Sequence, residues 1–486
     1  MEKTGQEPEI SLSHFKNILE AGVKAKKALT EQERIEIQIV TPMFGGGHKS
    51  GEVDQAIPVR ASAIRGHLRF WWRATRGAAY ENVSALRRRE VAIFGDTNNP
   101  SRVRVWIDKK KTAQPKPAME EYLDRMNRRK KRFVRQLVTY AVFPYRDTKN
   151  SENKARTFSY LPSYDFTLCL RIEEASSSGN NESNQDDLTV DDVKKEVYAA
   201  IWAWINFGGL GSRTRRGCGS LYCAEFSPGA SDMADLKQWF EKQLKKHNLM
   251  LPPRGILRGW PTLCSEFYVK SVSSDYPDRA WKGAIDTYQR FRSLSNTKSG
   301  EKKRSHWPEA DSLRKMMGMA EPDHENPNTL SSGDLEYAFP RAQFGMPIIF
   351  EFKQDIHLKS RTDGKREPYK SQLVPKERER LASPLIVKAL AVGNSKKITG
   401  ISMFAILNQP ELDEVELQIQ EQGGNTDIVE KRLKRKPIEK KHIYPTLKYE
   451  KSPMKDLNGN PVQSAIDAFL DSEEVRTWLK IKTDRG

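Results

Sequence analysis

The sequence predicts an α+β fold in which short strands and two amphipathic helices follow one another in the order β, α, β, β, α, β. The strands are indicated by runs of β-branched and aromatic residues, and the helices by apolar residues at helical spacing. This order is typical of a ferredoxin-like, or RRM-like, domain. The pattern restarts after residue 226, so we predict a polar segment, 1–33, and two tandem ferredoxin-like domains with insertions, 34–226 and 227–486.

In the first domain, isoleucines alternate with polar residues over 34–40 and predict the first strand. Apolar residues at helical spacing then predict a helix over 63–76, for which Ser62 is a candidate cap. The other predicted elements are strands at 103–107, 137–142 and 166–172, a helix from Val193 that stops at the glycine pair 208–209, and a strand at 221–226.

The second domain is predicted from weaker signals. Its candidate elements are a strand at 263–269, a helix at 281–292, strands at 346–352 and 398–407, and a closing helix at 464–479. Three polar or charged stretches, 174–192, 294–336 and 354–380, are predicted to be insertions.

The composition indicates a ligand of negative charge. Among 486 residues, 82 lysines and arginines exceed 64 acidic residues, which gives a net charge of +18. Because the excess is clustered, it favours a polyanion as partner, although solubility alone is an alternative. The four cysteines form no CxxC pair, so we expect no structural zinc site and no cofactor. No leader and no long apolar run is evident, so we expect a cytoplasmic protein with reduced thiols and no membrane role.

The stretch TPMFGGGHKSG, residues 41–51, superficially resembles a phosphate-binding nucleotide loop. Such a loop needs its lysine directly after the last glycine and a helix opening at once. Here a histidine intervenes and the next helix begins only near residue 62, so we reject an ATPase. Glycines still allow a ligand to approach the backbone closely, and the alternative is a plain mobile loop. The candidate contacts with a polyanion are Gly45, Gly46, Gly47, His48 and Lys49.

The helix that follows carries a stripe of arginines. In SAIRGHLRFWWRATR the arginines recur at steps of four, four and three, within an arc of about 80°. The alternative is a solvated helix face, but such faces usually alternate in sign and this helix contains no acid. We therefore favour contacts with backbone phosphates. The candidates are Arg60, which precedes the helix, and Arg65, Arg69, Arg73 and Arg76.

A second glycine-rich segment, GGLGSRTRRGCGS at 208–220, combines five glycines with three arginines. Its backbone could follow a phosphate chain while the arginines neutralise it. The candidates are Gly209, Gly211, Arg213, Arg215 and Arg216. Two basic runs, 125–135 and 431–441, are ambiguous and could equally be solvated helix faces or tails.

An enzyme is the main competing class. A metal-independent ribonuclease needs an acid or base near the phosphate, and His48 and His67 are the candidates. His67 lies opposite the arginine stripe on the helical wheel, which weakens it. No carboxylate cluster for metal-dependent cleavage is apparent, so we expect no metal site.

Together, TPMFGGG, Asp54, IPVRASAIRGHLRFWWRATRG and GGLGSRTRRGCGS resemble the RAMP superfamily of CRISPR effector proteins, and most closely its first-subunit family of the Cmr, or type III-B, complex. The resemblance covers 34–226. It implies tandem ferredoxin-like RAMP domains, with the family's glycine-rich loop at 208–219. It also implies a non-catalytic subunit at the head of an antiviral ribonucleoprotein, near the 3′ end of the guide RNA (crRNA). Its partners would be guide RNA, target RNA and other RAMP subunits.

Two alternatives remain beside this resemblance. One is a metal-independent endoribonuclease that processes guide RNA with His48, helped by the arginine stripe. The other is a general nucleic-acid-binding protein that works alone. The central strands lack the usual pair of aromatic stacking motifs, so we expect loops and helix arginines, rather than an open sheet face, to hold RNA.

Overall fold

The structure is a computed structural model of the chain. It describes residues 16, 32–47, 51–109, 112–124, 126–149, 155–174, 188–271, 276–295, 305–318, 335–352, 368–422 and 431–483. His48 and Lys49, and most of the predicted insertion 174–192, lie outside the described residues.

The first half of the chain forms a four-stranded antiparallel sheet in the order β11-β1-β10-β3. Numbered along the chain, these strands lie in the order 4-1-3-2, and one helix follows the first strand and another the third. This is the ferredoxin-like arrangement that the sequence predicts. The elements are β1 (Glu33–Ile39), α2 (Ala61–Ala74), β3 (Val103–Lys109), β10 (Tyr164–Ile172), α5 (Val190–Phe207) and β11 (Leu221–Tyr222).

The second half repeats this arrangement. Its sheet has the order β15-β16-β12-β19, which is 2-3-1-4 along the chain and therefore the same order read from the other edge. Two tandem ferredoxin-like domains are thus confirmed as the fold class. The elements are β12 (Thr262–Ser271), α7 (Pro277–Arg292), β15 (Leu385–Gly393), β16 (Ile398–Asn408), α10 (Ala465–Leu470) and β19 (Leu479–Lys482).

Local sequence explains the main elements. In β1, Ile35, Ile37 and Ile39 are buried while the residues between them are more accessible. Helix α5 begins with a capping box in which Thr189 and Asp192 satisfy each other's backbone N–H groups. The prediction of these elements is confirmed.

The predicted closing helix at 464–479 was wrong in its second part. Helix α10 is capped by Ser464 but ends at Leu470, and the chain then turns into β19. Pairing of β19 with β12 places Ile481 opposite Phe267, and both side chains are fully buried. Completing the sheet buries more apolar surface than one further turn of α10 would, because the residues that directly follow α10 are rich in charged side chains.

Between β3 and β10 the first half carries a long β-rich insertion. The predicted strand at 137–142 was wrong, because Val138, Ala141 and Val142 are buried along one side of a short helix. The basic run 125–135 contributes the second strand of a hairpin, not a helix face. The elements are β4 (Lys116–Pro117), β5 (Met119–Leu123), β6 (Arg129–Phe133), α4 (Thr139–Val142), β7 (Thr148–Lys149), β8 (Ala155–Arg156) and β9 (Ser159–Leu161), and β9 also pairs with β2 (Met43–Phe44).

The second half contains a third four-stranded sheet, in the order β13-β14-β17-β18. The basic run 431–441, interpreted from sequence as a helix face or tail, forms the edge strand of this sheet and a short helix. The predicted insertions 294–336 and 354–380 also contain α8 and β14. The elements are α8 (Glu309–Met317), β13 (Ile348–Phe350), β14 (Ser371–Pro375), β17 (Glu414–Gln422), β18 (Lys431–Glu439) and α9 (Lys440–Ile443).

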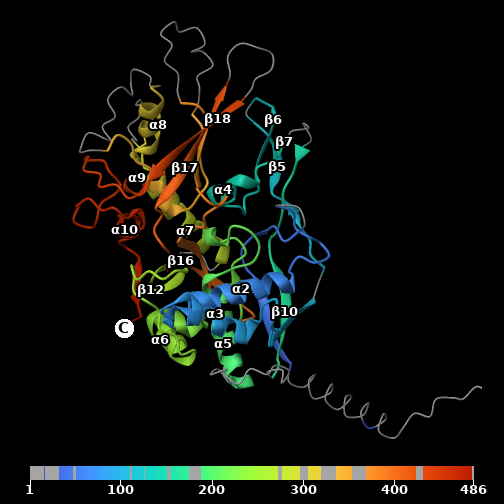
Figure 1. Cartoon of the computed structure of the whole chain (residues 1–486). Coiled ribbons are helices and arrows are strands. Elements are labelled where there is room, and N and C mark those ends of the chain that lie inside the picture. Colours follow the sequence, from blue (N-terminus) through green and yellow to red (C-terminus); the bar gives the residue numbers. More distant parts are fainter. Residues whose placement is uncertain are drawn as a thin grey trace, which may run out of the picture.

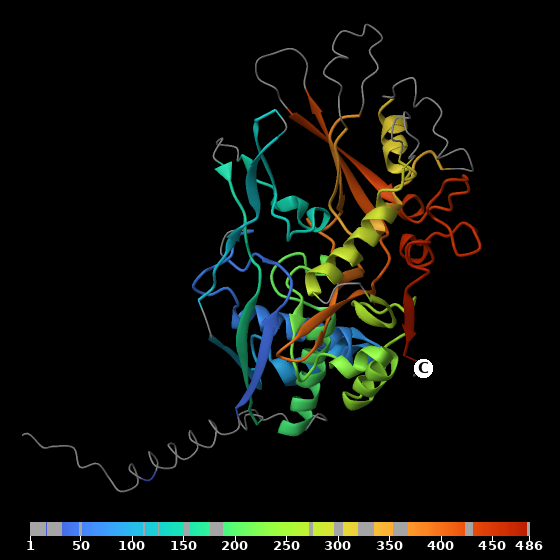
Figure 2. The same ribbon diagram turned by 180° about the vertical axis from the view of Figure 1, so that it is seen from behind.

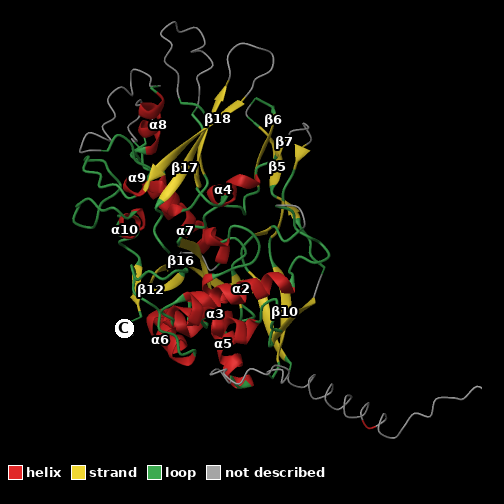
Figure 3. Cartoon of the chain, viewed as in Figure 1, coloured by secondary structure: helices red, strands yellow, loops and turns green. Residues whose placement is uncertain are grey.

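Two further helices, α3 (Val83–Phe94) and α6 (Leu236–Lys246), were not predicted from the sequence. Figures 1 and 2 show α2, α3, α5 and α6 gathered at the lower end of the molecule, whereas β5, β6, β17 and β18 lie at the upper end. Figure 3 shows these four helices in red beside β10 and β12, and the strands of the upper end in yellow beside α4, α8 and α9. The two domains share one core, since Phe207 of α5 packs on Phe267 of β12 with ring centroids 4.9 Å apart.

Candidate RNA interface

The two glycine-rich segments of the sequence meet in the structure. Ser212 donates its backbone N–H to the carbonyl of Phe44 at 2.7 Å, and Gly219 donates to Pro42 at 3.0 Å. Gly211 has a φ of +80°, and an added Cβ would lie 2.3 Å from the Phe44 carbonyl oxygen. Only glycine fits this contact without strain. We call the paired segments 42–47 and 208–219 the glycine junction.

The glycine junction is fixed on its first-domain side. The ring of Phe44 stacks on Tyr145, with centroids 4.4 Å apart and planes 3° from parallel. Gly45 has a φ of +78°, and an added Cβ would meet the Ser212 hydroxyl. Gly47 donates its N–H to the Glu52 carbonyl at 3.0 Å. The described glycines 45–47 therefore form a packed turn, in which the backbone is brought close to the second glycine segment.

The arginine stripe of α2 faces acids from neighbouring helices. Arg69 and Arg73 both contact one carboxylate oxygen of Glu90 in α3, at 2.7 and 2.6 Å. That carboxylate is 4% exposed, so the two arginines are the partners of a buried acid. The absence of acids within the helix favoured RNA contacts, but the fold supplies the counter-charge from elsewhere. These ion pairs give Arg69 and Arg73 a role in packing, and their contact with RNA stays a prediction.

A second buried acid, Glu196 of α5, anchors the end of the stripe. It pairs with Arg76 at 3.5 Å and Arg89 at 3.0 Å, and accepts a hydrogen bond from the indole N–H of Trp72 at 2.8 Å. Arg65, in contrast, is exposed and has no ion pair with any described residue. Within the predicted stripe, Arg65 is therefore the arginine most available to an external phosphate.

Arg60 lies at the start of α2 and pairs with Asp54 at 3.3 Å. Asp54 accepts backbone hydrogen bonds from Ala56 and Ile57, each at 2.9 Å. The bond from Ile57, aided by Arg60, lowers the pKa of the Asp54 carboxyl group below its usual value. Asp54 thus orders the turn that leads into α2, a local role consistent with its position in the motif.

The three arginines of the second glycine segment point into the protein. Arg213, with a φ of +59°, donates Nε–H to the Ala141 carbonyl of α4. The guanidinium of Arg215 lies over the rings of Phe70 and Trp71, at 5.1 and 5.8 Å. Burial lowers the pKa of Arg215 to about 10, so the group stays charged at neutral pH.

Arg216 joins the first domain to the second. It donates hydrogen bonds to the Tyr288 hydroxyl at 2.8 Å and to the Phe344 and Leu385 carbonyls at 3.2 and 3.3 Å. Its own carbonyl accepts from the indole of Trp281 at 2.6 Å. Sequence reasoning expected this residue to neutralise phosphate, and the structure adds a role in holding the domains together.

The histidine candidates differ in what the structure shows. His67 stacks on Trp204 with centroids 5.9 Å apart, and burial together with Arg215 lowers its pKa to about 4. It is therefore neutral at pH 7. His48, like Lys49, lies outside the described residues.

Several functional classes lack a visible site in the described part of the chain. There, no group of three or more His, Cys, Asp or Glu side chains could hold a metal ion. All four cysteines are buried and free. No described helix has both the length and the apolar character needed to cross a bilayer.

Sequence reasoning missed the acids and the lysine that organise this region: Glu90, Glu196 and Lys388. The Asn82 cap of α3, which accepts the Ala85 N–H, was a local signal that could have identified the helix carrying Glu90. Which charges this acid meets depends on tertiary packing.

Comparisons with known proteins match different shares of the chain. The family model of the RAMP superfamily matches residues 36–222. The CRISPR system Cmr subunit Cmr1-2 of Pyrococcus furiosus is 28% identical over 192 residues, which are 38% of this chain and 91% of that protein.

Solved structures give matches at lower identity. The apo crystal structure of Cmr1 from Pyrococcus furiosus is 19% identical and has a TM-score of 0.38, covering 78% of this chain and 90% of that chain. A cryo-EM structure of the type III-B Cmr-beta complex bound to cognate target RNA contains a chain 13% identical, with a TM-score of 0.40, covering 77% of this chain and 94% of that one.

The family match spans the elements built up above from residues and contacts. Residues 36–222 include both halves of the glycine junction, helix α2 with its arginines, and the whole 4-1-3-2 sheet except the first residues of β1. On this match, residues 36–222 are similar to the RAMP superfamily.

Proposed function

We propose that this chain is a non-catalytic, RNA-binding RAMP subunit of a type III-B CRISPR ribonucleoprotein. It sits at the head of the complex, near the 3′ end of the guide RNA, and helps to hold target RNA for antiviral defence. Its partners are guide RNA, target RNA and other RAMP subunits. The family match and the likeness to the Cmr1-2 subunit support this assignment.

The glycine junction is the observation that carries the proposal. Glycines 45–47, Gly209 and Gly211 allow two stretches of backbone to approach each other closely. Beside them, Arg60 and Arg65 lie at the start of α2 and are accessible to a ligand. Exposed backbone N–H groups and arginines bind phosphates without reading bases, which suits a guide whose sequence varies.

Purification of the chain from its native host under mild salt, followed by sequencing of the copurifying RNA and identification of the proteins, tests membership of the complex. We expect small RNAs with a common repeat-derived end, together with other RAMP subunits. A lone protein with heterogeneous nucleic acid would instead support a general nucleic-acid-binding protein, which should also bind duplex DNA.

Filter binding to single-stranded RNA tests the interface. Arg65→Ala should weaken binding and reduce the log-log salt slope by about 0.7, the value for one lost phosphate contact on a single strand. Arg476→Ala is the matched control, because Arg476 is exposed and pairs only with Glu473 among the described residues. Equal slopes for wild type and Arg65→Ala would remove Arg65 from the interface.

Incubation with guide-repeat RNA in the absence of metal tests the competing enzyme. We expect no cleavage by the wild-type chain. Cleavage that disappears in His48→Ala, while binding survives, would replace the proposal with a processing endoribonuclease.

A further inference from the structure

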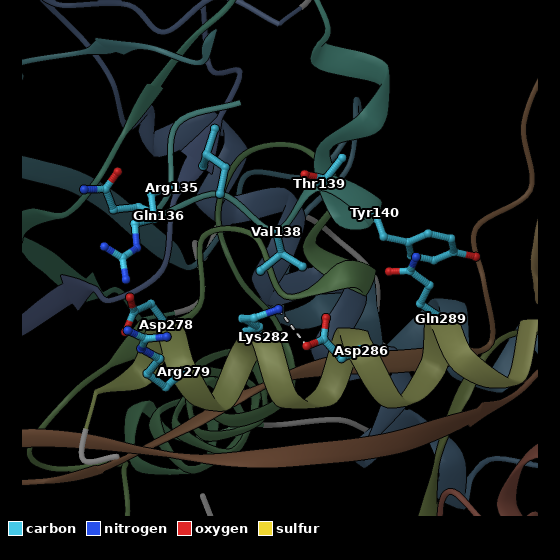
Figure 4. Close-up of a pocket in the computed structure, with 11 residues that line it drawn as sticks. Arg135, Gln136, Val138, Thr139, Tyr140, Asp278, Arg279, Lys282, Asp286 and Gln289 are labelled. Atoms are coloured by element: carbon cyan, nitrogen blue, oxygen red, sulfur yellow. Dashed lines mark hydrogen bonds and ion pairs between the residues drawn. The ribbon is translucent and has the colours of Figure 1, made fainter. Parts of the chain in front are cut away.

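A polar cavity of about 370 Å³ lies where the insertion of the first domain meets helix α7 of the second. One wall is the segment 135–140, which leads into α4. The other is one face of α7, where four of the lining residues recur at steps of four, four and three and Arg279 lies beside the first of them (Figure 4). The four residues at these steps are Asp278, Lys282, Asp286 and Gln289. We call this cavity the interdomain cleft.

The cleft has an apolar base and an aromatic edge. Leu137 and Val138 are buried, and Figure 4 shows Val138 directed toward α7 between Lys282 and Asp286. Tyr140 is partly buried and lies beside Gln289 in the same view. Its ring packs edge-on against Tyr288, with centroids 6.1 Å apart. One edge of the cleft is therefore a supported aromatic ring.

The polar groups of the cleft are only partly satisfied. Lys282 and Asp286 form an ion pair at 2.7 Å. Arg135 and Arg279 are exposed, and neither has an ion pair with another described residue. Figure 4 shows Arg135 directed from its wall toward Asp278. The amides of Gln136 and Gln289, each with donors and an acceptor, have no hydrogen-bond partner among the described side chains and backbone.

Both walls are positioned by the glycine junction. Arg213 donates to the Ala141 carbonyl of α4, behind the first wall. Arg216 bonds to Tyr288 and Trp281 on the buried side of α7, behind the second wall. The cleft is thus held open by packing on both sides, so a ligand would not have to order it.

We propose that the interdomain cleft binds one unstacked nucleotide of a single-stranded RNA. Tyr140 stacks on the base, and the amide of Gln289 beside it meets the polar edge of the base (Figure 4). Arg135 and Arg279, at the other end of the cleft, contact the flanking phosphates. This proposal rests on the proposed RNA-binding function and deepens it, because it adds a site that contacts a base to an interface of phosphate contacts.

The chemistry of the lining favours this ligand over a simple anion. An anion needs only the cations, whereas the Gln289 amide, with unused donors and an acceptor beside an aromatic ring, suits a flat base with a polar edge. The two aspartates also reduce the net positive charge of the lining. This reduction would weaken binding of a phosphate ion alone.

The test compares binding of the full chain to a short single-stranded RNA and to a base-free ribose-phosphate chain of equal length. Tyr140→Ala should weaken binding of the RNA by about 5- to 150-fold, the range for losing one stacked base, and leave binding of the base-free chain unchanged. Tyr140→Phe keeps the ring and should bind RNA as the wild type does. Unchanged binding of the base-free chain by Tyr140→Ala shows that this variant is still folded.

The two arginines are tested together. Arg135→Ala combined with Arg279→Ala should weaken binding of both ligands and reduce the salt slope by about 1.4, for two contacts. Arg290→Ala is the matched control, because Arg290 is exposed on the same helix but does not line the cleft. Its slope should equal that of the wild type.

Two results would overturn the proposal and separate it from the general function. If the wild type binds RNA and Tyr140→Ala binds it equally well, the cleft holds no base while the proposed RNA-binding function stands. If the wild-type chain binds neither ligand at low salt, both proposals fail together.

Discussion

The side-chain amino group of Lys388 in β15 of the second domain donates a hydrogen bond to the carbonyl of Gly208, at 2.9 Å, where α5 of the first domain ends. A second bond reaches the Ile205 carbonyl at 3.2 Å. Lys388 is fully buried, so it caps the helix inside the contact between the domains. The domain contact and the glycine junction are thereby fixed at the same place.

Lys388→Met should destabilise the protein. At pH 9 we expect a loss of about 1–3 kcal/mol in the free energy of unfolding, because two buried carbonyls lose their donor. Chemical denaturation measures this loss. Lys396→Met is the matched control, since Lys396 is exposed in the turn between β15 and β16, and it should change the free energy by less than about 0.5 kcal/mol. Equal stabilities of Lys388→Met and wild type would mean that the cap is not needed.

The stabilisation by Lys388 should depend on pH. Burial lowers the pKa of Lys388 to about 7, whereas a lysine in the unfolded chain titrates near about 10.4. Between these values the unfolded chain holds a proton that the folded chain has released, so stability rises with pH. The advantage of wild type over Lys388→Met should therefore grow from pH 7 to pH 10 and stay constant below pH 6. Denaturation of both proteins across this range measures it, and a difference that is flat or falls with pH would contradict the assignment.

Glu90→Gln separates the packing role of the α2 arginines from RNA binding. Loss of the shared carboxylate should destabilise the protein by about 1–3 kcal/mol. It also releases Arg69 and Arg73, so the salt slope of RNA binding should steepen by about 0.7 for each arginine that then engages a phosphate. An unchanged slope would leave these two arginines with a packing role only. Glu81→Gln is the control, because Glu81 is exposed and has no ion pair with another described residue.

Two glycine substitutions should have opposite effects. Gly211→Ala places a Cβ against the Phe44 carbonyl at a positive φ, so we expect a loss of more than about 1 kcal/mol and weaker RNA binding. Gly66→Ala, on the exposed side of α2 with no atom within 4 Å of the added Cβ, should stabilise the protein by about 0.5–1 kcal/mol. Thermal unfolding of both variants measures this. A Gly211→Ala protein as stable as wild type would argue against a tight glycine junction.

The sequence by itself determined the local elements and the fold class. The alternating isoleucines of β1, the apolar stripe of α2 and the glycine stop after α5 each depend on neighbours within a few residues. Such periodicities are encoded locally, so they can be recognised without the fold. The two glycine segments were also recognisable as candidate ligand sites, because their composition alone indicates close backbone approach.

Only the tertiary structure decided which of these groups meet. Ser212 contacts Phe44 from 168 positions away, and Lys388 reaches Gly208 from 180 positions away. The sequence did not show that the arginine stripe has acidic partners, because Glu90 and Glu196 belong to other helices. A local pattern specifies a helix or strand and the face it buries. Which other element packs against that face depends on the fold of the whole chain, and no single stretch of sequence contains this information.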